Sequence, residues 1–146
     1  MFLTSTLPFC TKTHPWWPLW ATKTSDRDHI QQLDFTSDTA LVSSFVGSLS
    51  ASGGGDDVPK DVLGGLRSLL YLSWTSEARC IVHIADAPPH GRPLHEHPPG
   101  HDRYSVPGSE PHGLYHSEIL EMWIHKNINY ICLRINNDTD RMAERH

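Results

Sequence analysis

The most constraining feature of this chain is the near-continuous apolar segment RCIVHIA at residues 79–85, which ends abruptly at Asp86 and two prolines. Such runs are typical of strands that are buried on both faces in a parallel sheet. A parallel strand reaches its neighbour through a crossover connection, most often a helix. The segment therefore predicts an α/β fold. We expect His83, which lies inside the strand, to be a hydrogen-bonded core histidine.

The remaining apolar patterns alternate with this strand along the chain. Apolar residues recur at helical spacing over residues 41–49 and again over residues 58–70, on either side of a glycine-rich loop. Ser, Thr and Asp favour helix N-caps because their side chains accept hydrogen bonds from free backbone N–H groups. The expected caps are Thr36 or Ser37 for the first helix and Asp56 or Asp57 for the second.

A further helix and a second buried strand follow a long loop. The helix is predicted over residues 117–126 and the strand over residues 128–135. The alternating order predicts a Rossmann-like parallel sheet with helices on both faces. In such sheets ligands bind beyond the carboxyl ends of the strands, where Asp86 falls. The helix residues expected to face inward are Ile119, Leu120, Trp123 and Ile124.

Composition excludes several classes of function. The 146 residues suffice for one domain, and the net charge of −5, from 17 acidic and 12 basic residues, argues against binding to nucleic-acid phosphates. No apolar run approaches the roughly 20 residues that span a bilayer. Three widely spaced cysteines form no disulfide framework and favour a reducing compartment. We therefore expect a cytoplasmic protein that binds neither nucleic acid nor membrane.

Residues 88–113 form a long loop rich in proline, glycine and histidine. Loops of this length inside a compact domain are usually functional or disordered. Neutral imidazoles and a carboxylate suit tetrahedral Zn²⁺, although the histidine spacing matches no established zinc motif. A solvated loop that holds no ligand is the alternative. No nucleophile and base occur at the spacing of a catalytic motif, so we do not expect an enzyme.

Four segments resemble von Willebrand factor A (VWA) domains of the kind found beside alpha-type protein kinase domains. They are LDFTSDTALVSSFVGSLSASGGGDDVPKDVLGGL (33–66), HIADAPPHG (83–91), PGSEPHGL (107–114) and NINYICLRINNDTDRM (127–142). The resemblance covers roughly residues 26–142. It implies a non-enzymatic module that binds an unidentified protein partner, or an accessory domain of an alpha-type serine/threonine protein kinase.

The resemblance also implies where metal ligands would lie. Adhesion-type VWA sites bind Mg²⁺ through a D-x-S-x-S motif, a central Thr-type ligand and a final Asp. Asp86 matches that final Asp, and Ser52 or Asp56 takes the central place. The D-x-S-x-S motif is absent upstream of residue 50, so we expect no competent Mg²⁺ site, because Mg²⁺ needs near-octahedral oxygen ligation. The positions at which the family tends to carry His or Asp give the zinc candidates His90, His95, Asp102 and His112.

The N-terminal residues 1–25 resemble nothing in the family and carry three of the five tryptophans. We hypothesise that residues up to about Thr24 are translated out of frame, because a one-base shift permits the apolar strand that the family places here. The expected organisation is an irregular segment, a partial VWA-like domain over residues 26–142, and a tail of residues 143–146. A domain without its first metal-site strand is expected to be marginally stable, since each buried apolar side chain contributes about 1.5–3 kcal/mol.

Overall fold

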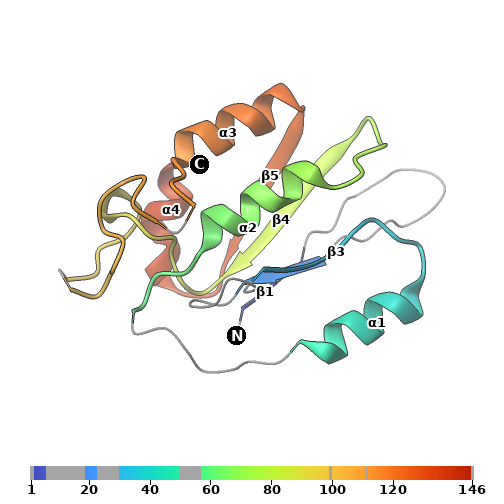
Figure 1. Cartoon of the computed structure of the whole chain (residues 1–146), viewed down its shortest axis with the longest axis horizontal. Helices are drawn as coiled ribbons and strands as arrows, with labels where there is room; N and C mark the ends of the chain where they lie inside the picture. Colours follow the sequence, from blue (N-terminus) through green and yellow to red (C-terminus); the bar gives the residue numbers. More distant parts are fainter. Residues whose placement is uncertain are drawn as a thin grey trace.

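The computed structural model describes residues 2–5, 19–22, 30–49, 57–98, 100–110 and 112–145, which form a mixed α/β arrangement (Figure 1). Its strands are β1 (Phe2–Ser5), β2 (Leu19–Thr22), β3 (Ile30–Leu33), β4 (Arg79–Ala85) and β5 (Ile128–Arg134). Its α-helices are α1 (Thr39–Ser48), α2 (Val62–Ser68), α3 (His116–His125) and α4 (Asp140–Arg145). Three short 3₁₀ helices are η1 (Leu69–Tyr71), η2 (Arg92–Leu94) and η3 (Asn137–Thr139).

The described strands form two sheets. Strands β4 and β5 pair in parallel, from Arg79 opposite Ile128 to Ala85 opposite Arg134. The connection between them carries the long loop and α3, so it is a crossover of the kind that a parallel pair requires. Strands β1, β2 and β3 form an antiparallel sheet, and β1 also lies against β4. The predicted strand at residues 79–85 is confirmed, and so is its parallel partner.

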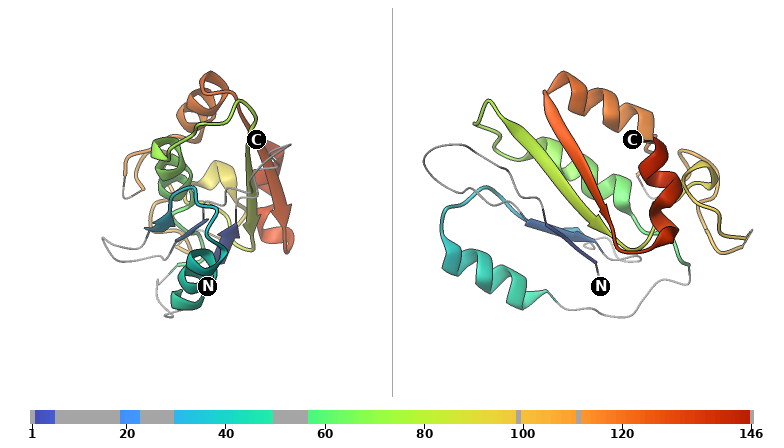
Figure 2. Two further views of the ribbon diagram at one scale, coloured as in Figure 1. Left: turned by 90° about the vertical axis from the view of Figure 1, so that its right-hand side faces the viewer. Right: turned by 180° about the vertical axis from the view of Figure 1, so that it is seen from behind.

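The core lies between the β4–β5 pair and the helices α2 and α3, which cover the same face of that pair (Figure 2). Trp123 of α3 is 2% exposed and its ring lies 5.0 Å from the ring of Tyr130 on β5. The predicted apolar stripe of α2 is buried as expected, apart from a partly exposed Val58. The buried members contributed by α2, η1 and β4 are Val62, Leu63, Leu66, Leu69, Leu70, Ile81 and Ala85.

The opposite face of β5 is exposed. Ile131 and Leu133 point away from the core and are 49% and 48% exposed, and Ile135, just after the strand, is 66% exposed. Ile124 was predicted to face inward, which is wrong: it is 78% exposed. At the end of α3 the helix has turned past the core, so the buried positions are Ile119 and Trp123.

The predicted caps of the first two helices are wrong. Asp38 caps α1, where its carboxylate accepts hydrogen bonds from Ala40 and Leu41. Helix α2 begins only at Val62 and is capped by Asp61. The residues before it are held in an extended form by contacts to the long loop, described below, so the helix cannot start at Asp57.

Two of the strands, β1 and β2, fall within residues 1–25, and α4 reaches into the predicted tail.

The part of the chain that the structure describes contains no helix long and apolar enough to cross a membrane. Cys80 and Cys132 are free thiols, and burial raises the pKa of each.

Candidate functional site

The long loop folds back onto the extended segment before α2. The amide of Val58 donates to the carbonyl of His101 at 3.2 Å, and the amide of Lys60 donates to the carbonyl of Pro88 at 2.9 Å. The amide of Arg103 donates to the Asp57 carboxylate at 3.2 Å. Three segments that are far apart in the sequence are thereby brought together at the carboxyl end of β4.

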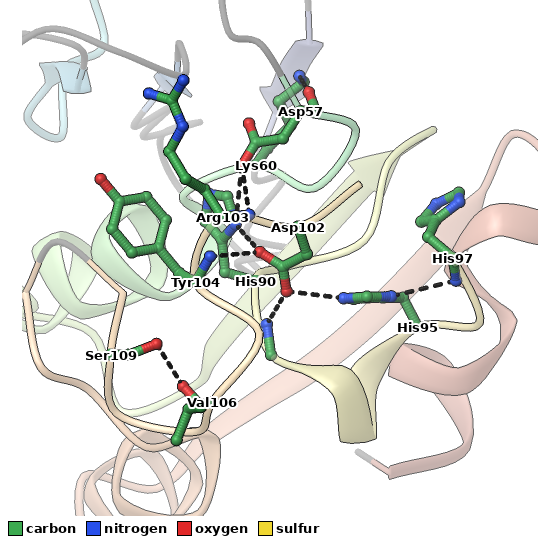
Figure 3. A network of polar contacts seen from close by, with 11 residues as sticks. Asp57, Lys60, His90, His95, His97, Asp102, Arg103, Tyr104, Val106 and Ser109 are labelled. Atoms are coloured by element: carbon green, nitrogen blue, oxygen red, sulfur yellow. Dashed lines mark hydrogen bonds and ion pairs between the residues drawn. The ribbon is translucent and has the colours of Figure 1, made fainter. Parts of the chain in front are cut away.

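Asp102 is the centre of this arrangement (Figure 3). Its Oδ1 accepts from the amide of Tyr104 at 2.9 Å and lies 2.8 Å from Nδ1 of His90. Its Oδ2 accepts from the amide of Gly91 at 2.9 Å and lies 2.8 Å from Nε2 of His95. Gly91 has a φ of 105°, which side-chain-bearing residues rarely adopt, so the turn that presents its amide to Asp102 favours glycine.

The hydrogen bonds of His95 fix its tautomer. Its Nδ1 accepts a hydrogen bond from the amide of His97 at 3.2 Å, so this nitrogen carries a lone pair. The hydrogen must then sit on Nε2, which donates it to Asp102. His95 thus donates to Asp102 through Nε2 and accepts from the amide of His97 through Nδ1.

Asp57 completes the cluster. Its Oδ2 lies 3.7 Å from Nδ1 of His90, and one ligand atom from each of Asp57, His90 and Asp102 lies within 4.8 Å of the other two. The side chains of His90, Asp102 and Asp57 are only 2%, 2% and 8% exposed. The sequence predicts Asp57 only as a helix cap, because Asp57 lies far from the histidines along the chain.

Burial and hydrogen bonding oppose each other at Asp102. Burial acts to raise the pKa of this carboxyl group, but the hydrogen bonds from His95, Gly91, His90 and Tyr104 outweigh it, so the pKa lies below its usual value. Asp102 is therefore ionised at neutral pH.

The fourth zinc candidate, His112, lies elsewhere. Its Nε2 is 2.8 Å from Oδ2 of Asp61, the N-cap of α2, while Oδ1 of Asp61 accepts from the amide of Gly64 at 2.9 Å. A Cβ atom at Gly64 would lie 2.6 Å from both Asp61 Oδ1 and a ring carbon of His112. Glycine at this position therefore lets the pair pack against the first turn of α2. The structure brings together His90, His95 and Asp102 but not His112.

Of the candidates for an adhesion-type Mg²⁺ site, only Asp86 falls within the described residues, since Ser52 and Asp56 lie outside them. Asp86 follows β4, and its Oδ1 is buried without a hydrogen-bond partner among the residues that the structure describes. Burial raises the pKa of Asp86, and the nearby Asp138 carboxylate adds to the effect while Lys60 opposes it. Burial lowers the pKa of Lys60, against the attraction of Asp57 and Asp86. An ammonium group thus lies close to both carboxylates.

A cleft of about 550 Å³ lies between residues 96–98 of the long loop and the helices η3 and α4. Its walls carry more acidic than basic side chains, and Arg141 bridges it through a 2.8 Å ion pair with Glu96. The lining residues are Glu96, His97, Pro98, Asn137, Asp138, Asp140, Arg141 and Glu144.

Comparison with known proteins gives one informative relative. An alpha-protein kinase of Dictyostelium discoideum, vwkA, is 36% identical to this chain over 112 residues, which is 75% of the chain. The chain spans only 17% of the length of that kinase. No protein-family model matches the chain, and no solved structure does. The chain is therefore similar to one part of an alpha-type protein kinase.

Proposed function

We propose that this chain is a VWA-like, non-catalytic accessory module of an alpha-type protein kinase and acts by binding protein. The observation that carries the proposal is the 36% identity to an alpha-protein kinase over 112 residues, of which the chain represents a small part. The sequence motifs of the chain resemble VWA domains of the alpha-kinase type, which agrees with that match.

The parallel β4–β5 pair supports a Rossmann-like architecture. Helix α3 lies in the crossover between the two strands and packs on the same face as α2. Asp86 follows β4 at the carboxyl edge, the position at which α/β folds place functional residues.

Two features favour a non-catalytic role. The side chains of His90, His95 and Asp102 are at most 2% exposed, so a substrate could not reach these acid–base groups. At the adhesion-type position, Lys60 places a positive charge near Asp57 and Asp86. A positive charge at this position disfavours a Mg²⁺ ion, so the module is expected to bind its partner without Mg²⁺.

The exposed face of β5 is the surface that we assign to the partner. Parallel sheets are normally covered on both faces, yet Ile131 and Leu133 are about half exposed. A helix from another part of a kinase polypeptide would bury them, because helices are the elements that cover the faces of parallel sheets. Burial of each of these side chains would contribute about 1.5–3 kcal/mol.

Deletion of the matching segment from the Dictyostelium kinase, followed by binding of the separate chain, tests this proposal. Deletion of its matching segment should leave phosphorylation of a peptide substrate within about twofold, since an accessory module supplies no catalytic group. This chain, purified separately, should bind to the kinase that lacks the matching segment. The double variant Ile131→Ser/Leu133→Ser of this chain should bind to the same truncated kinase at least tenfold more weakly. The matched control is Val106→Ser, which removes an apolar side chain that is 65% exposed elsewhere.

Two results would contradict the proposal. Loss of peptide phosphorylation on deletion would place the segment within the catalytic machinery. Phosphate transfer from ATP by the purified chain alone would show that it is itself an enzyme. A third result concerns only the surface: equal binding by the β5 variant and the control would show that the partner does not bind to β5.

A further inference from the structure

The buried cluster around His90 contains two carboxylates, those of Asp57 and Asp102. His95 donates to Asp102 and accepts a hydrogen bond from the amide of His97. Lys60 lies on another side of Asp57, where its Nζ donates to the Asp57 carbonyl at 3.1 Å and is shared with Asp86. Buried charges are stable only when they are paired or when they coordinate a metal. The atom between the two carboxylates is Nδ1 of His90, so a cation bound there would balance the charge.

We propose that Asp57, His90 and Asp102 bind a divalent transition-metal ion, with Zn²⁺ as the expected occupant. The site is independent of the partner-binding role proposed above. It differs from the four residues that the sequence singles out, because Asp57 replaces His112 and His95 supports Asp102 without binding the ion.

The distances in the cluster suit such an ion. Zn²⁺ binds nitrogen and oxygen ligands at roughly 2.0–2.2 Å, so tetrahedral ligand atoms lie about 3.3 Å apart. Nδ1 of His90 lies 2.8 Å from Oδ1 of Asp102 and 3.7 Å from Oδ2 of Asp57. An ion that displaces the hydrogen from Nδ1 of His90 would lengthen the distance from Nδ1 to Asp102 by about half an ångström. It would shorten the distance from Nδ1 to Asp57 by about the same amount. Water would complete the coordination.

The contacts of Asp102 match those of a metal-binding carboxylate. Its Oδ2 accepts hydrogen bonds from His95 and from the amide of Gly91, while its Oδ1 faces His90 and also accepts from the amide of Tyr104. Hydrogen bonds of this kind orient a ligating carboxylate and strengthen metal binding. His95 is thus a positioning residue in this site.

The ligand types select the metal. One imidazole with two carboxylates suits Zn²⁺ and related transition metals, whereas Ca²⁺ and Mg²⁺ favour shells of oxygen alone. Because metal ligands bind in their deprotonated forms, zinc binding is expected to weaken as the solution is acidified.

Zinc content and zinc titration of the purified chain test the site. The wild-type chain should retain about one zinc ion after dialysis against metal-free buffer, and His90→Ala and Asp57→Asn should each lose it. His95→Ala should bind zinc about 10- to 100-fold more weakly, which is the usual effect of removing a group that supports a ligand. Cobalt(II) in place of zinc should give visible absorption bands typical of tetrahedral coordination in the wild-type chain.

Matched variants separate this site from other histidines. His101→Ala removes an exposed histidine of the same loop and should leave zinc binding unchanged, as should His112→Ala. Circular dichroism establishes which variants fold. Asp57→Asn decides the matter if His90→Ala unfolds, since the amide oxygen of asparagine can still accept the hydrogen bond from the Arg103 amide. The proposal is overturned if the folded wild-type chain binds no zinc at micromolar free metal, or if Asp57→Asn binds as tightly as wild type.

Discussion

The hydroxyl group of Tyr130 lies 2.6 Å from Nδ1 of His83, and the two residues come from neighbouring parallel strands. His83 is 1% exposed, so the prediction of a hydrogen-bonded core histidine in β4 is confirmed. Burial raises the pKa of Tyr130 far above its usual value, so its hydroxyl group stays protonated. A buried polar pair therefore joins β4 to β5 within an otherwise apolar core.

Tyr130→Phe tests the energetic weight of this contact. Removal of the hydroxyl group takes a partner from buried His83, which should lower the free energy of unfolding by about 1–3 kcal/mol. Urea denaturation followed by circular dichroism measures the change. Tyr71→Phe is the control, because Tyr71 is 73% exposed, and it should change stability by less than about 0.5 kcal/mol. Equal effects of the two substitutions would contradict this reading.

The two helix caps provide a second comparison. Asp61 caps α2, is 3% exposed and also contacts His112, whereas Asp38 caps α1, which has no buried residue. Asp61→Ala should therefore destabilise the fold by about 2 kcal/mol or more, since both a cap and a buried contact are lost. Asp38→Ala should cost no more than about 0.5–1 kcal/mol. Thermal unfolding of the two variants side by side gives the ranking, and the reverse order would show that α1 belongs to the cooperative core.

Asp102→Asn should be the most damaging of the single substitutions discussed here. An asparagine amide keeps only one acceptor oxygen. Its N–H₂ group would face hydrogen-bond donors that now donate to the second carboxylate oxygen. The expected loss is about 3 kcal/mol or more, because buried groups are left unpaired. Glu121→Gln makes the same chemical change at an exposed site and should be nearly neutral. Chemical denaturation distinguishes the two, and a neutral Asp102→Asn would mean that the loop does not depend on this carboxylate.

The sequence predicts most strongly where the apolar pattern is continuous. Residues 79–85 carry one near-continuous apolar run, and β4 has these bounds. The start of α2 could not be predicted in the same way, because the amides of Val58 and Lys60 donate to the distant carbonyls of His101 and Pro88. Those long-range hydrogen bonds outweigh the local preference of Asp57 and Pro59 for a helix start.

The candidate site shows the same limit. Residue type alone singles out the histidines of the long loop and Asp102, because imidazole and carboxylate groups are metal ligands. Which of them meet is decided by turns that no periodicity reveals. Glu110 accepts hydrogen bonds from the amides of His112 and Leu114, which directs this part of the loop towards Asp61 rather than towards His90. Asp57 joins the cluster only through tertiary contacts.

Asp86 and Asp102 are expected to affect acid stability with opposite signs. The pKa of Asp102 is lowered in the folded chain, so its contribution to stability is present above the ordinary aspartate value of 3.8 and is lost as the pH falls through the folded pKa. The pKa of Asp86 is raised by burial, so the folded chain holds this proton more tightly. Its ionisation therefore costs stability as the pH rises from 3.8 through the folded pKa.

Two asparagine variants separate these effects in urea denaturation between pH 3 and pH 7. Asp86→Asn keeps the side chain neutral, so it should raise the urea midpoint at pH 7 relative to wild type and change it little at pH 3. Asp102→Asn should lower the midpoint at pH 7, and its deficit should shrink as the pH falls below 3.8, where this carboxyl group takes up its proton in the unfolded wild-type chain. A lower midpoint for Asp86→Asn at pH 7 would mean that the charge of Asp86 is stabilised in the folded chain, either by Lys60 or by a bound cation.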